Sequence, residues 1–317
     1  MKYLDYSKLA GFIAKHYAGS VDERRVGRLR QYESDYVDIV RFFGPDGVRP
    51  SDVRLNFLAE SFRIVDPTIR EFAQRIAFQM RAEGRIYSGP AVMKLASADL
   101  ASGTPHLVVQ PCDFGLQAGT CLALDLPDRR FQSVGGTLRD YYRRGCIVPT
   151  IDNNPLAICI GVCAMMIIDE RGDRFLHRVE RSSRLASLQN TLGPSVAGMV
   201  DFTTRSQNLS DLIETAVSME VAEELHLHRD EYEVVPLAWA IELFRGERPQ
   251  IFCLIRTLLD RENIGARLDA IPSNEREFAS YAFVPLYGGS LLDRKDIDAL
   301  NFEARMNYYL AEEHLNL

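Results

Sequence analysis

The sequence predicts an α/β fold in which mixed strands lie between helices, preceded by a helical region and a small β-rich segment. Three observations support this fold class. An apolar run at residues 154–169 is typical of a buried strand. Alternating segments at 233–244 and 250–258 are typical of two further strands. A helix that carries several glutamates, around residues 219–227, lies between these strand segments.

The first 84 residues are predicted to be helical, because apolar residues recur there at spacings of three and four. The segments are 7–17, 22–43, 51–64 and 67–83. Ser51 and Asp52 are start signals for the third helix, and Asp66 precedes a proline at the first turn of the fourth. We therefore predict a helical N-terminal region over residues 1–84.

Residues 85–150 consist of short apolar runs separated by Gly and Pro, which favours strands over helices. The runs are 86–87, 92–95, 106–110, 120–124 and 131–134, followed by a predicted helix at 138–144. We predict a β-rich linking segment over 85–150 and a third unit over 151–317. In that unit a turn at 170–173 leads to a strand at 174–179 and a Gly-rich segment at 192–200. A strand at 280–286 and a helix at 293–315 end it.

Composition excludes several classes of protein. The 317 residues are 46% hydrophobic, so the chain can bury a core. A net charge of −7 and a pI near 5.5 disfavour nucleic acid as a partner. The six cysteines show no CxxC spacing, which disfavours structural zinc and disulfides. We find no secretory signal and no apolar run long enough to span a bilayer, so we predict a cytoplasmic protein without membrane contact.

Three glutamates lie on one side of the helix around residues 219–227. Residues three and four apart are neighbours on a helix, so Glu220 faces both Glu223 and Glu224. Carboxylates held this close repel one another unless a cation lies among them, and oxygen ligands of this kind suit Mg²⁺ or Mn²⁺. The alternative is a solvated acidic face. We predict a divalent-metal site.

The order of strand, hairpin, basic strand, Gly-rich segment and acidic helix resembles the Nudix hydrolase superfamily. Its motif runs Gly, five residues, Glu, seven residues, Arg-Glu, an aliphatic residue, any residue, Glu-Glu, any residue, Gly and an aliphatic residue. The matching positions are Glu220, Val221, Glu223, Glu224 and Leu227. The resemblance covers about residues 150–317 and implies a Nudix-type α/β/α sandwich with a mixed sheet.

Four positions depart from the motif: Asp211 replaces the first Glu, Arg205 the first Gly, Met219 the Arg and His226 the closing Gly. Asp keeps the carboxylate. Histidine enters the left-handed backbone region more readily than most residues, so the helix can still end there. In the family the Arg orients a glutamate by ion pairing, which methionine cannot do. Arg205, or one of Arg178, Arg181 and Arg184, is a candidate replacement.

The resemblance implies roles for individual residues. Glu220, Glu223 and Glu224 would bind Mg²⁺ or Mn²⁺ and be catalytic. Glu277, or its neighbour Glu275, precedes the strand at 281–286 and would be the general base. Arg181 follows the second core strand and would hold phosphate oxygens with its planar fork. Gly198 lies in the small-residue turn that precedes the motif, where it would contact the substrate.

The predicted function is therefore divalent-metal-dependent hydrolysis of a diphosphate bond in a nucleoside diphosphate-linked or nucleoside triphosphate substrate. One alternative is a catalytically degenerate nucleotide sensor or partner-binding module, since Met219, Arg205 and His226 have drifted from the motif. Another is an isomerase of isopentenyl diphosphate, which would require Cys159 or Cys163 to face the glutamates. By analogy with the family we expect a homodimer through residues 85–150.

Overall fold

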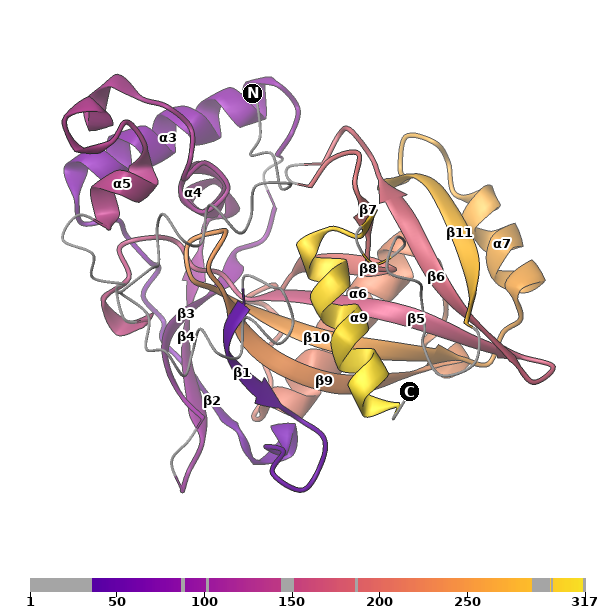
Figure 1. Ribbon diagram of the computed structural model, residues 1–317. Coiled ribbons are helices and arrows are strands. Elements are labelled where there is room, and N and C mark those ends of the chain that lie inside the picture. Colours follow the sequence, from indigo (N-terminus) through magenta and orange to yellow (C-terminus); the bar gives the residue numbers. More distant parts are fainter. Residues whose placement is uncertain are drawn as a thin grey trace.

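The computed structural model describes residues 36–86, 89–100, 103–143, 151–185, 188–286, 297 and 299–315. Within these ranges the chain forms one large mixed sheet, one small sheet, and helices on both sides of the large sheet (Figure 1). The predicted helix at 7–17 and most of the one at 22–43 lie outside the described residues.

The large sheet has the strand order β1-β9-β10-β5-β6-β11, with β7 paired to β6 and β8 paired to β5. Its strands are β1 (Tyr36–Arg41), β5 (Gly161–Glu170), β6 (Asp173–Arg181), β7 (Leu192–Gly193), β8 (Val196–Met199), β9 (Tyr232–Glu242), β10 (Arg248–Thr257) and β11 (Phe278–Leu286). β5 and β10 are parallel, whereas the other neighbours are antiparallel, so the sheet is mixed. The central strand β5 is buried along most of its length, as its apolar run predicts.

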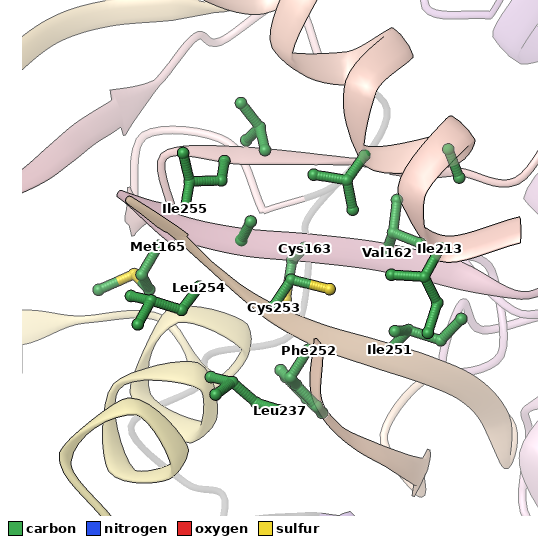
Figure 2. Close-up of a cluster of buried hydrophobic side chains, with 14 of the residues drawn as sticks. Val162, Cys163, Met165, Ile213, Leu237, Ile251, Phe252, Cys253, Leu254 and Ile255 are labelled. Carbon is green, nitrogen blue, oxygen red and sulfur yellow. The ribbon is translucent and has the colours of Figure 1, made fainter. Parts of the chain in front are cut away.

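Helices cover both faces of this sheet. α6 (Leu209–Glu224) packs on one face and α9 (Phe302–His314) on the other, while α7 (Arg261–Ala270) flanks β11 (Figure 1). Figure 2 shows the apolar layers between them, with Ile213 of α6 beside Val162, and Met165 and Leu254 directed toward α9. The predicted α/β/α sandwich is confirmed.

The sequence sets both ends of α6. The Asn208 side chain accepts a hydrogen bond from the Asp211 backbone N–H at 3.0 Å, which caps the first turn. After the last turn, His226 adopts a left-handed conformation with φ of 55°, as expected for a histidine in place of the motif's closing glycine. The glutamates therefore lie in the last two turns of a helix with fixed ends.

The small sheet has the order β2-β4-β3. Its strands are β2 (Arg54–Phe57), β3 (Val92–Asp99) and β4 (His106–Cys112). The helices α3 (Pro67–Ala82), α4 (Phe114–Thr120) and α5 (Leu138–Tyr142) surround a second apolar core. Short 3-10 turns occupy η2 (Pro50–Asp52), η3 (Arg129–Val134), η4 (Ile151–Asn153) and η5 (Arg229–Glu231).

Several predicted elements of the first half are wrong. The helix predicted at 51–64 is replaced by η2 and β2, and residues 36–41 at the end of the helix predicted at 22–43 form β1. The strands predicted at 120–124 and 131–134 are the end of α4 with a following turn and a 3-10 turn. In each case a short apolar run fits both the helical and the strand periodicity. Contacts with segments distant in the sequence then decide which of the two structures forms. The helices predicted at 67–83 and 138–144 are confirmed as α3 and α5.

The two sheets are joined by backbone hydrogen bonds. The Met93 N–H donates to the Val200 carbonyl at 2.7 Å, and the Ile160 N–H donates to the Met93 carbonyl at 2.8 Å. β2 lies before residue 84 in the sequence and β4 lies after it, and these two strands pair with each other. The division into units 1–84, 85–150 and 151–317 stays a prediction. Within the described ranges, no helix has the length and apolar character needed to cross a bilayer.

Candidate metal and diphosphate site

A cleft of about 470 Å³ lies between the α3–α4 part and the large sheet. One side is formed by the end of α6, by β8, by the end of β6 and by the loop before β11. The other side is formed by α4 and the residues before β3. The predicted site residues that line it are Arg181, Gly198, Glu220, Glu223 and Glu277. Glu224 lies directly behind them, so the structure brings all six predicted residues together.

The α6 glutamates are held against β8. The Ala197 N–H donates to Glu224 Oε1 at 3.0 Å, and the Glu224 and Glu220 side chains are hydrogen bonded to each other. Gly198 faces Glu220 so closely that a Cβ at this position would overlap the Glu220 carboxylate. Gly198 is therefore required for the close approach of β8 to the glutamates, and its predicted contact with substrate stays a prediction.

The crowded carboxylates hold protons more tightly than isolated ones. Burial, followed by the negative charges of Glu277 and Glu223, raises the pKa of Glu220 to about 8. Burial, Glu277 and Glu220 raise the pKa of Glu224 well above its ordinary value. The cleft also contains Asp201, whose burial raises its pKa. Sequence reasoning missed Asp201, because it lies beyond β8 and outside the motif.

Glu277 lies at the mouth of the cleft, immediately before β11. Surrounding protein atoms raise the pKa of its carboxyl even though the side chain keeps contact with solvent; Arg181 opposes this shift, and Glu223 adds to it. Arg184 donates hydrogen bonds from Nη2 to the carbonyls of Ser273 at 2.6 Å and Arg276 at 3.0 Å. This contact holds the loop that carries Glu277. The other predicted base, Glu275, lines the same cleft and is exposed, as Glu277 is.

Arg181 is the cation at the base of this carboxylate group. It is buried, and its stem passes within 3.0 Å of where a Cβ at Gly193 would lie. Its positive charge lowers the pKa of Glu224 against the effect of burial, and its Nε has no hydrogen-bond partner among the residues that the structure describes. A buried guanidinium N–H without a partner is suited to bind a ligand oxygen.

Two of the arginines that were candidates to replace the motif's Arg can be located. Arg205 does not lie against the glutamates, because its guanidinium lies over the rings of Phe57 and Phe202, at 5.5 and 5.0 Å from their centroids. That candidate is wrong. Arg181 is the arginine whose charge reaches Glu224. Met219 instead accepts a weak hydrogen bond from Thr204 Oγ1 at 3.7 Å.

The donor set fits a divalent cation in its chemistry. As the side chains stand, no three His, Cys, Asp or Glu residues in the described ranges are arranged to hold an ion. Glu220, Glu223 and Glu224 nevertheless offer only hard oxygen donors, and burial together with neighbouring negative charges raises the pKa of Glu220 and Glu224. A cation bound among these carboxylates would offset their negative charge and favour their ionised form.

A second charged group on the cleft floor was not predicted. Arg245 lies in the turn between β9 and β10 and Arg248 is the first residue of β10, and both line the cleft together with Glu303 of α9. Arg245 Nε donates to Glu242 Oε1 at 2.7 Å, and Arg248 Nη2 donates to Glu303 Oε1 at 3.0 Å. All four side chains are buried, so two cations and two anions compensate each other away from water.

Neither cysteine proposed for an isomerase faces the glutamates. Cys163 lies on β5 and accepts a weak hydrogen bond from Asn307 of α9 at 3.7 Å, on the face opposite α6. Cys159 precedes β5 and lies next to Cys112. Burial raises the pKa of both thiols. The strand expected over residues 154–169 begins only at Gly161, so Cys159 lies outside it, and neither of these two thiols is at the site.

Comparison with known proteins gives matches among solved structures alone. No protein-family model and no curated protein matches the sequence. The NUDIX domain of Shewanella oneidensis NrtR, solved with ADP ribose, is 15% identical with a TM-score of 0.33, over 50% of this chain and 89% of that domain. A Caenorhabditis elegans Ap4A hydrolase is 13% identical with a TM-score of 0.30, over 50% of this chain and 97% of that chain.

A further match is S. oneidensis NrtR in complex with a 27mer DNA, which is 14% identical with a TM-score of 0.32. The match covers 49% of this chain and 61% of that one, so this chain spans less than two thirds of that protein's length. The expectation that nucleic acid is not a partner stays a prediction. Of the three solved structures, the first is described as a NUDIX domain.

Proposed function

We propose that this protein hydrolyses a diphosphate bond in a nucleoside diphosphate-linked or nucleoside triphosphate compound, with Mg²⁺ or Mn²⁺. The observation that supports this proposal is the composition of one cleft. The carboxylates of Glu220, Glu223, Glu224 and Glu277 lie together at this cleft with Arg181, whose Nε has no hydrogen-bond partner within the described ranges. Acidic metal ligands beside a buried phosphate-binding cation are what cleavage of a diphosphate requires.

Each residue has a distinct part in this proposal. Glu220, Glu223 and Glu224 would hold the ion, which neutralises the diphosphate and lowers the pKa of a bound water. Arg181 orients a phosphate oxygen through its free N–H. Glu277 accepts the proton of the attacking water, a role that its raised pKa favours over that of an ordinary carboxylate. Gly198 allows the Glu220 carboxylate to lie against the β8 backbone.

A nucleotide sensor without catalysis is the second candidate. Met219 lies where the family motif has its arginine, and the glutamates are not arranged as ligands in the described structure. A sensor would bind a nucleotide in the cleft and release no product.

One assay separates the two functions. The protein is incubated in Mg²⁺ or Mn²⁺ with nucleoside triphosphates, ADP-ribose, NAD, dinucleoside polyphosphates and nucleotide sugars, and the mixtures are separated by chromatography. The proposed hydrolase gives products that disappear on addition of EDTA. A ligand-induced rise in melting temperature without any product would support the sensor and overturn the hydrolase.

The metal and the glutamate protons are expected to compete. Because the pKa of Glu220 is raised from 4.5 to about 8 in the folded protein, the folded state keeps a proton that the unfolded state releases in this pH window. The free energy of unfolding of the metal-free protein should therefore fall as the pH rises through the window between these two pKa values. Millimolar Mg²⁺ should raise the melting temperature more at a pH of about 8.5 than at about 5.5, because binding expels the proton.

The matched variant is Glu220→Gln/Glu223→Gln/Glu224→Gln, which keeps the shape of the three side chains. The melting temperature of this variant should not rise on addition of Mg²⁺, and its stability should not fall with rising pH as that of the parent does. Equal Mg²⁺-induced shifts in the two proteins would place the ion elsewhere.

A further inference from the structure

The wall of the cleft opposite the glutamates comes from the first half of the chain. Phe114 and Gln117 of α4, Leu122 after it, and Val92 at the start of β3 line this side. Phe114 and Leu122 are half-buried, so parts of both side chains are open to the cleft. This wall is mainly apolar, whereas the α6 side is acidic.

Gln117 is the polar exception in this wall. Its side chain is fully buried, and its Nε2 donates a weak hydrogen bond to Met199 Sδ at 3.4 Å. Its Oε1 has no hydrogen-bond partner among the described residues. A buried carboxamide oxygen without a donor carries a free-energy cost, because it has lost its hydrogen bonds to water. A ligand that brings an N–H group to this oxygen would remove that cost.

The surrounding contacts keep Gln117 in place. A Cβ on Gly119 would overlap the Ala73 backbone, so α4 lies directly against α3. The Ala157 N–H donates to Thr120 Oγ1 at 3.3 Å, and Cys121 Sγ donates to the Ala157 carbonyl at 3.3 Å. α4 is therefore fixed on two sides, and the Gln117 side chain cannot leave the cleft wall by a movement of its helix.

We propose that this wall binds the heterocyclic base of the substrate, with the Phe114 ring packing against it and Gln117 Oε1 accepting a hydrogen bond from a base N–H. This inference rests on the proposed function, because the diphosphate would lie on the glutamate side of the same cleft. Aromatic contacts with a planar heterocycle provide affinity, and one buried acceptor provides specificity. Gln117 thus selects bases that carry an amino or ring N–H group over bases that lack one.

The test uses AMP and purine riboside 5′-monophosphate, which differ in one amino group. Calorimetry should show that the parent binds AMP about tenfold more tightly, the effect of one buried hydrogen bond. Gln117→Met keeps the length of the side chain but removes the acceptor, so the two ligands should bind it equally. The control Gln79→Met changes an exposed glutamine of α3 and should keep the tenfold preference.

Phe114→Leu is the second variant, and it should weaken binding of both nucleotides by the same factor while keeping the preference for AMP. If the parent binds the two ligands equally, or if Gln117→Met keeps the preference, the inference is wrong. Failure of the parent to bind AMP, CMP or GMP, all of which carry such N–H groups, also overturns it. Monophosphates contain no diphosphate bond, so the calorimetry tests base recognition separately from hydrolysis. Base recognition can fail while the hydrolase assay gives products, and the hydrolase assay can fail while base recognition is observed.

Discussion

Glu223→Gln is expected to lower kcat for the substrate identified in the hydrolase assay by about a thousandfold. A metal ion contributes several kcal/mol of charge stabilisation to such a reaction, and 1.36 kcal/mol corresponds to a factor of ten in rate. Glu223 is the exposed member of the three glutamates Glu220, Glu223 and Glu224, and it lines the cleft. Because its side chain is solvated, its replacement should change the free energy of unfolding by less than about 0.5 kcal/mol. The rate loss would therefore reflect the site and not the fold.

Glu262→Gln provides the control for Glu223→Gln. It removes an exposed carboxylate from the first turn of α7, outside the cleft, and should keep the parental kcat. Steady-state rates at saturating Mg²⁺, with unfolding curves for both variants, complete the measurement. A Glu223→Gln protein that is folded and turns over at the parental rate would refute the assignment of this glutamate as a metal ligand.

Glu303→Gln is expected to cause the largest loss of stability, about 3–5 kcal/mol in the free energy of unfolding. Burial alone would raise the pKa of Glu303, but the positive charges of Arg245 and Arg248 outweigh it and hold the pKa below its ordinary value. Without this carboxylate, Arg245 and Arg248 would keep their hydrogen bonds to Glu242 and lose those to Glu303. An uncompensated buried charge is costly because it has lost its hydration.

The matched control for this variant is Asp169→Asn, which breaks an exposed ion pair with Arg174 at 3.0 Å. Exposed pairs contribute at most about 1 kcal/mol, so the midpoint of urea unfolding should hardly move. The difference between the variants should narrow in acid, because a carboxylate with a lowered pKa loses its contribution as the pH falls through that pKa. Equal midpoints for Glu303→Gln and Asp169→Asn at neutral pH would show that the buried group adds nothing to stability.

The elements that could be predicted are those with strong local patterns. β5 follows from a continuous apolar run, and the α6 glutamates follow from helical spacing together with a known motif. Arg181 could be found because it ends a strand beside that motif. β2 could not, because its four residues become a strand by pairing with β4, about 50 residues later in the chain.

The unpredicted half of the cleft depends on contacts between distant segments. The sequence pattern around Arg245 and Arg248 indicates surface residues of a turn. The packing of α9 brings Glu303 to them. Gln117 lies in a short helix whose neighbouring apolar run at 120–124 suggested a strand. Its unpaired oxygen is a property of three-dimensional packing that no spacing in the sequence encodes.

The outermost strand of the large sheet has a consequence for how the protein is made. β1 pairs with β9, with Tyr36 opposite Glu242, so the sheet edge is completed by one of the first described segments of the chain. A ribosome adds about 5–20 residues each second, so β1 waits on the order of 10–40 s before its partner is synthesised. During that interval β1 has no neighbouring strand with which to form hydrogen bonds. β9 then exposes an unpaired edge until β1 pairs with it. A chain started at residue 151 would never cover that edge, and its sheet would remain open to strands of other molecules.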